Sequence, residues 1–183
     1  MDLMTAIDSR ASAIKLIEPG PSREHLMRIM QAGARAPDHG RLTPWRFVVL
    51  EGEARDQLGN AMVEAARAAS PDISDVMLQR ERDKARRAPT IIVVAARVNQ
   101  GHKVPEIEQV LAVGAAVQNM FLAAHALGYG VMWKTGEAAY DENVKRAMGL
   151  AAEDHIVAFL YLGTIGTKGP VKPSSIDNLV QWL

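Results

Sequence analysis

The sequence predicts a single α+β domain in which helices pack against a β-sheet. Helix-like and strand-like segments alternate along all 183 residues, and no repeat, low-complexity stretch or linker divides them. Residues 90–96 form a continuous apolar, largely β-branched run, which is typical of a strand covered on both faces. We therefore expect residues 1–183 to form one domain, large enough to bury a core without disulfides or metals.

The first half of the chain carries four helical patterns and one strand before that run. Ser22 is a typical N-cap residue, and apolar residues recur after it at helical spacing until Pro37 ends the helix. The run Arg46–Glu51 predicts a strand, closed by Gly52. Further helices are expected over residues 2–9, 53–69 and 72–87.

The second half contains a long helix from Pro105 to about Leu127, which Gly128-Tyr129-Gly130 stops. A strand over 131–135, a helix over 141–148, a buried strand over 155–162 and an apolar tail over 176–183 follow.

The long helix is apolar almost all round from Val110 to Ala124, and such a helix must be buried on every side. Two explanations remain open: the helix is the central core helix of a monomer, or it lies at a large dimer interface. We favour the interface, because one chain of this size has little protein with which to surround it.

Composition narrows the classes of function. Twenty-one basic and 21 acidic residues give no electrostatic footprint for nucleic acid or a membrane surface. The chain has no basic-then-apolar leader after Met1, no apolar run near the ~18 residues of a membrane span, and no cysteine. We expect a soluble cytoplasmic protein that binds neither nucleic acid nor membranes.

Several familiar motifs are only partly present. Gly128-Tyr129-Gly130 lacks the third glycine of a dinucleotide fingerprint, and Gly163–Gly169 lacks the spacing of a phosphate loop. The five histidines show no metal-ligand spacing, and there is no nucleophile elbow. We therefore predict no catalytic nucleophile and no metal site.

Two other segments are better candidates for ligand binding. Arg10-Ala11-Ser12, with Lys15 shortly after, offers a guanidinium and a hydroxyl that suit phosphate oxygens. Arg35–His39 is followed by Thr43–Phe47, where prolines and a tryptophan stiffen a loop before a strand. Taken alone, each segment is more often structural than functional.

Together, in this order and spacing, these segments resemble the nitroreductase superfamily, and in particular its short YdjA-like branch. The residues that carry the resemblance are Arg10 and Ser12, Ala36-Pro37-Asp38-His39, Pro44–Phe47, His102–Pro105, Gly128–Gly136 and Phe159–Thr164. The resemblance implies a central, mostly antiparallel sheet flanked by helices, in an intertwined homodimer with flavin sites shared between subunits. It also implies non-covalent FMN, NADH or NADPH as hydride donor, and nitroaromatics, quinones or related small molecules as electron acceptors.

The same resemblance implies roles for individual residues. Arg10 and Ser12 would hold the FMN phosphate and ribityl chain, with Ala11 contributing backbone; Arg35 and His39 would contact the flavin. Trp133, Lys134 and Thr135 would line it. The residues expected near the nicotinamide nucleotide are Ala123, Ala124, His125, Ala126, Leu127 and Gly128. The chain departs from the family at Ala11, where relatives often have a second arginine, and at Ile14, where they have a basic residue.

The expected chemistry needs few protein groups. Hydride transfer between stacked rings requires positioning and exclusion of water rather than an acid or a nucleophile. A cation near the flavin would stabilise its reduced form, and Lys134 and Lys15 are both candidates. Two alternatives stay open: a non-catalytic protein that binds or stores FMN, and a dehalogenase or flavin-fragmenting enzyme on the same fold.

Overall fold

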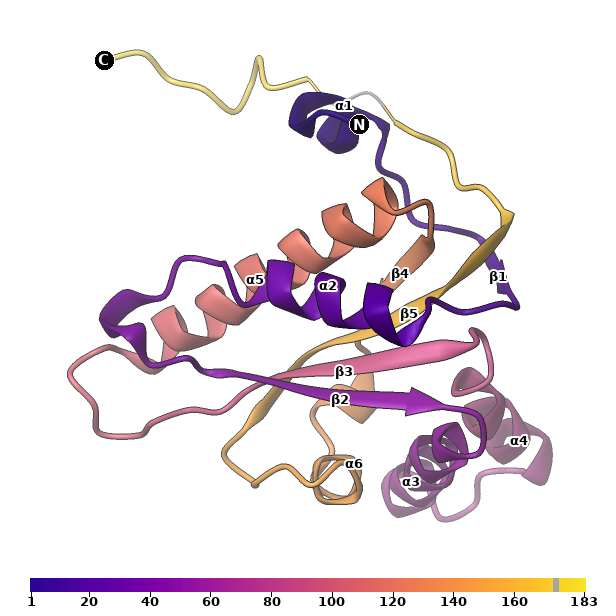
Figure 1. Ribbon diagram of the computed structural model, residues 1–183. Helices are drawn as coiled ribbons and strands as arrows, with labels where there is room; N and C mark the ends of the chain where they lie inside the picture. Colours follow the sequence, from indigo (N-terminus) through magenta and orange to yellow (C-terminus); the bar gives the residue numbers. More distant parts are fainter. Residues whose placement is uncertain (173–174) are drawn as a thin grey trace.

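The computed structural model describes residues 1–172 and 175–183 and contains one five-stranded sheet. Its order is β1-β5-β3-β2, with β4 also paired to β5, and every pair is antiparallel (Figure 1). The strands are β1 (Lys15–Ile17), β2 (Trp45–Glu51), β3 (Thr90–Ala96), β4 (Gly130–Lys134) and β5 (His155–Thr167). The predicted antiparallel α+β class is confirmed.

The helices form two layers, one on each face of the sheet (Figure 1). Helices α2 (Arg23–Gly33) and α5 (Glu106–Ala126) pack together on one face. Helices α3 (Ala54–Ala69) and α6 (Glu142–Ala147) cover the other, with α4 (Asp75–Lys84) against α3. The short α1 (Leu3–Ser9) lies against α5, and single 3-10 turns occupy His39–Arg41 and Glu137–Ala139.

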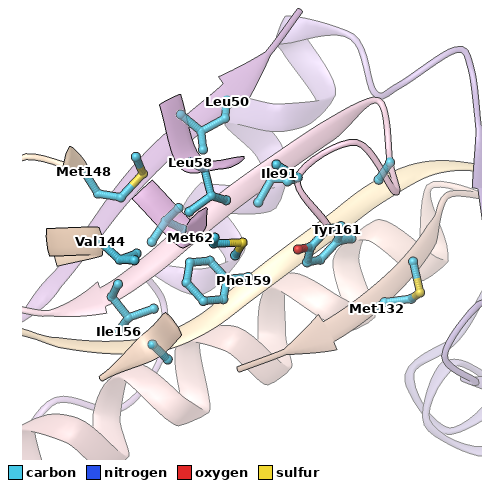
Figure 2. Close-up of a cluster of buried hydrophobic side chains, with 14 of the residues drawn as sticks. Leu50, Leu58, Met62, Ile91, Met132, Val144, Met148, Ile156, Phe159 and Tyr161 are labelled. Carbon is cyan, nitrogen blue, oxygen red and sulfur yellow. The ribbon is translucent and has the colours of Figure 1, made fainter. Parts of the chain in front are cut away.

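Strand β3 separates two hydrophobic cores, because successive side chains of a strand point to opposite faces. One set packs toward α3 and α6: Ile91, Val93 and Ala95. The alternate set packs toward α2 and α5: Ile92, Val94 and Ala96. Figure 2 shows the first core, where Phe159 and Tyr161 of β5 meet Leu58 and Met62 of α3. The prediction of a strand covered on both faces is confirmed.

Helix α5 is buried along one side only. Val113, Val117 and Met120 are fully buried against the sheet and α2, whereas Ile107 and Leu111 are 61% and 63% exposed. The helix is long and apolar enough to cross a membrane, but its buried side packs in the domain as a core helix does. The expectation of burial all round is therefore wrong for a single chain. An apolar stripe of α5 that includes Ile107 and Leu111 remains uncovered.

The remaining differences from the sequence prediction concern element ends. Strand β1 was not expected, and β5 continues five residues beyond Leu162 because its extension pairs with β1. Pro105 caps α5 rather than opening it, α4 covers only part of 72–87, and Thr135 lies just beyond β4. The apolar tail over 176–183 extends away from the body and is exposed (Figure 1).

Candidate functional site

The segment that follows α1 carries the first three predicted site residues. Arg10 is the C-cap of α1, and its guanidinium carbon lies 4.9 Å from the centroid of the Phe121 ring on α5. Such a cation–π contact holds the charge against the helix while leaving N–H donors available. Ala11 is half-buried, and Ser12 is exposed. Backbone bonds from Ala13 to Val131 and from Ile14 to Thr167 fix this segment to β4 and β5.

A lysine that was not among the predicted site residues lies beside this segment. Lys168 follows β5 and lines a small cavity together with Ala11, Phe121 and His125. The close approach depends on Gly169, where an added Cβ would stand 2.0 Å from the Ser12 carbonyl oxygen. The sequence signal for this position is the lysine in Gly163–Gly169, a segment without the spacing of a phosphate loop.

These groups form a cluster of positive charge. No salt bridge among residues 1–172 and 175–183 involves Arg10 or Lys168, so both cations are available to an anion. The third nearby group, His125, lies within hydrogen-bonding distance of the Ser9 hydroxyl, 2.9 Å from it. Burial, followed by the charges of Lys168 and Arg10, holds the pKa of His125 below its ordinary value. We call Arg10, Ser12, His125 and Lys168 the cationic cluster.

The second predicted segment lies near the other end of α5. Arg35 and Pro37 are exposed just after α2, and the Thr43 N–H donates to Asp38 Oδ2 at 2.6 Å, which closes the loop. His39 Nδ1 lies 2.5 Å from Glu108 Oε2 of α5. A cavity of about 290 Å³ opens here. Its lining consists of Pro37, His39, Glu108, Leu111, Ala112 and Ala115.

Trp133, Lys134 and Thr135 lie at the end of β4 and are exposed. The Trp133 indole N–H donates to the Val157 carbonyl at 3.0 Å, which fixes the ring beside β5. Lys134 takes part in none of the salt bridges found in the described part of the chain. Lys15, the alternative cation, begins β1 and is also exposed.

The residues from Ala123 to Gly128 form the last turn and C-terminus of α5. Ala124 is fully buried, whereas Ala126 and Gly128 are exposed. Ala123 and Leu127 are partly buried against the core of α2 and α5. Only part of this segment, including His125, reaches the surface where a ligand could touch it.

A larger cavity, of about 430 Å³, lies elsewhere in the domain. Arg46, Arg97 and Asp154 are among the residues that line it, and none of the predicted site residues does. Although this cavity is larger than the one beside His39, it is not part of the predicted site.

The two predicted segments do not meet within one chain. His39 contacts Glu108 near the start of α5, whereas Arg10 and Ser9 contact Phe121 and His125 near its end. Glu108 and His125 are 17 positions apart, which corresponds to about 25 Å along a helix. Each chain thus carries the two predicted segments at opposite ends of the same helix.

Solved structures with the same fold were found by comparison of coordinates. One, from Desulfovibrio desulfuricans and described as a nitroreductase in complex with FMN, is 26% identical with a TM-score of 0.77. The alignment covers 98% of this chain and 95% of that one. Another, the FMN- and NADPH-dependent nitroreductase NfnB from Sphigopyxis sp. strain HMH, is 17% identical with a TM-score of 0.80. The alignment covers 100% of this chain and 99% of NfnB.

Sequence comparison also finds nitroreductases, and the matches extend over most of the chain. The model of the Nitroreductase family matches residues 16–164. The Escherichia coli (strain K12) protein YdjA, an NAD(P)H nitroreductase by name, is 42% identical over 164 residues, which cover 90% of this chain and 88% of YdjA. With the family model matched over most of its length and a relative this similar, the chain belongs to the nitroreductase family.

Proposed function

We propose that this protein is a cytoplasmic FMN-dependent oxidoreductase that transfers electrons from NADH or NADPH to nitroaromatics, quinones or related small acceptors. It works as a homodimer with two flavin sites, each built from both subunits. The observation that carries the proposal is the cationic cluster, in which Arg10 and Lys168, neither paired by a salt bridge within residues 1–172 and 175–183, stand beside an exposed serine next to an apolar helix.

The residues of the cationic cluster fit the phosphate end of FMN. Arg10 and Lys168 supply charge-assisted donors, and Ser12 supplies a hydroxyl on the same segment. The cavity beside them is small, about 20 Å³, so a phosphate group would sit at its mouth. The contact of Gly169 with Ser12 keeps the lysine and arginine segments together, because a side chain at position 169 would separate them.

The uncovered apolar surface of α1 and α5 favours the proposal that a second subunit packs there. Ile107 and Leu111 on α5, and Leu3 and Met4 on α1, are each more than 60% exposed. If two copies pack their α5 helices antiparallel about a two-fold axis, the cationic cluster of one chain meets the His39 end of the other. This arrangement joins half-sites that lie about 25 Å apart along one helix. The exposed tail over 176–183 offers further apolar surface to the partner.

Within such a site, Arg10, Ser12 and the Ala11 backbone hold the phosphate and ribityl chain. Arg35 and His39 of the other subunit contact the flavin. Trp133, Lys134 and Thr135 line it, and Lys134 places a positive charge where the ring system gains electrons. The bound FMN supplies the two-electron chemistry, and the segment from Ala123 to Gly128, apart from His125 in the cationic cluster, borders the nicotinamide nucleotide. The chain's task is to orient both rings and to exclude water.

The first test is the cofactor itself. We expect the purified protein to be yellow, or to bind FMN in preference to FAD, because the cationic cluster suits a terminal monophosphate. Steady oxidation of NADH or NADPH with a quinone then separates an enzyme from a protein that only stores FMN. A colourless protein whose addition leaves FMN fluorescence unchanged would exclude the proposal.

The second test asks whether each site draws on both subunits. Arg10→Ala and Arg35→Ala should each disable both sites of a homodimer. In a mixed dimer of the two variants, one site collects both defects and the other is rebuilt from intact halves. The mixed species, isolated with two affinity tags, should bind about one FMN per dimer and recover up to roughly half of the wild-type activity. No recovery in stable mixed dimers would reject the shared site.

A further inference from the structure

The hydrogen bonds around His125 determine which ring nitrogen can gain a proton. The Ser9 hydroxyl donates its single hydrogen to the Thr5 carbonyl oxygen, 2.6 Å away, because a carbonyl can only accept. In its 2.9 Å contact with His125 Nε2, the Ser9 oxygen must therefore accept. Neutral His125 thus carries its hydrogen on Nε2, and a second proton can be added only at Nδ1.

Nδ1 is available for that proton and for a ligand. Within the described ranges, the only side-chain hydrogen bond of His125 is the one that its Nε2 makes with Ser9. The ring is partly buried and lines the same small cavity as Lys168. A proton on Nδ1 would therefore create a second donor on a ring that lines this cavity.

The charged groups around His125 are positive. Arg10 approaches from the segment after α1, and Lys168 from the end of β5. Tyr129, on the turn before β4, also lines the cavity, and its hydroxyl lies within hydrogen-bonding distance of His25 Nδ1 of α2. No carboxylate forms a hydrogen bond or salt bridge with His125 in the described part of the chain. Burial is the largest influence that lowers the pKa of His125, and the charges of Lys168 and Arg10 add to it while no anion is bound.

We propose that His125 takes up a proton on Nδ1 when a phosphate monoester binds between Arg10 and Lys168, and so becomes the third cation of the cationic cluster. The bound anion offsets the two charges that oppose protonation, and the new N–H donates to a phosphate oxygen. The proton comes from solvent, and no covalent bond changes. This inference rests on the proposed FMN site and adds to it a coupling between cofactor binding and pH.

The coupling has a definite sign. Because the occupied site binds an additional proton, the affinity for FMN gains up to tenfold for each pH unit by which the pH falls through the coupled range. The phosphate group has an opposite effect, because free FMN itself takes up a proton near pH 6. A variant that lacks the imidazole retains the phosphate effect and loses only the part due to His125.

The experiment compares wild-type dimers, freed of flavin, with His125→Gln and with His25→Gln. Glutamine at position 125 keeps an N–H donor for Ser9 but cannot be protonated. Affinity for FMN is measured by fluorescence quenching from pH 8 to pH 6. Calorimetry in two buffers of different ionisation enthalpy counts the protons taken up. Riboflavin, which lacks the phosphate, serves as the second probe.

We expect wild type and His25→Gln to take up more protons with FMN than His125→Gln does, by a difference of up to one per site. With riboflavin the three proteins should be alike. If His125→Gln matches wild type in proton uptake and pH profile with FMN, the role of His125 is overturned while the FMN site stands.

A separate measurement does not depend on flavin binding. Titration of ¹⁵N-histidine-labelled protein with inorganic phosphate should move the Nδ1 signal of His125 toward the protonated position at constant pH. A signal that stays unchanged at saturating phosphate contradicts the inference. Failure of FMN to bind, together with a normal phosphate response, would count against the proposed function alone.

Discussion

Replacement of Leu111 by alanine should weaken the dimer without unfolding the chain. The leucine is 63% exposed in one chain and lies on the uncovered stripe of α5. The change removes about three carbons, each contributing about 0.8 kcal/mol when buried. If the partner covers the exposed 63% of this leucine, the substitution reduces the free energy of association by about 1.5 kcal/mol per subunit. Two-fold symmetry doubles this to about 3 kcal/mol, which is on the order of a 100-fold weaker association.

Val76→Ala is the matched control, because Val76 is 65% exposed on α4, on the opposite face of the sheet from α5. Sedimentation of fluorescently labelled protein from nanomolar to micromolar concentration should show a raised dissociation constant for Leu111→Ala alone. Far-UV circular dichroism should be the same for both variants. An unchanged dimer in Leu111→Ala, or an equal loss in Val76→Ala, would refute the assignment of the stripe to the interface.

Three further changes test the core and the cationic cluster. Phe159→Ala should lower the free energy of unfolding by about 3–5 kcal/mol in urea titrations, since the ring is fully buried; a loss below 1 kcal/mol would contradict its central place. Gly169→Ala should weaken FMN binding at least about tenfold by fluorescence quenching, because its Cβ meets the Ser12 carbonyl; unchanged affinity would exclude this contact as a support. Burial raises the pKa of Tyr161 to about 12, against an opposing effect of Arg87. The unfolded chain loses this proton first, near pH 10, so stability should fall from pH 10 toward pH 12, by at most about 3 kcal/mol. Tyr161→Phe should remove that part of the pH dependence, and an identical pH profile would contradict it.

The parts of the fold that the sequence predicted are those with strong local patterns. The continuous apolar run of residues 90–96 predicts a strand that is covered on both faces. N-cap residues such as Ser22 mark where helices start. Strand β1 has no such signal, because three residues with one buried side chain do not make a pattern. It exists only because the end of β5 pairs with it, and that partner lies about 150 residues away in the sequence.

The candidate site also depends on contacts between residues far apart in the sequence, so local patterns indicate only part of it. The Arg10 and Arg35 segments were found through a resemblance, whereas Lys168 was missed because its closeness to Ser12 depends on how two ends of the chain meet. The contact of His39 with Glu108 joins positions 69 residues apart, which no local pattern encodes. The exposed side of α5 could not be predicted either. Composition shows that a helix is apolar, but it does not show which side of the helix its own chain covers.

The pairing of β1 with β5 also sets the order in which the protein can mature. During synthesis the Arg10 segment emerges first, yet the strand that holds it is among the last parts of the domain to be made. Contacts of this sequence separation also form slowly, because a long loop must close first. The cationic cluster therefore assembles only after residue 169 has left the ribosome. Under the proposed function, FMN would not guide the early folding of the chain and would be captured by an almost finished domain.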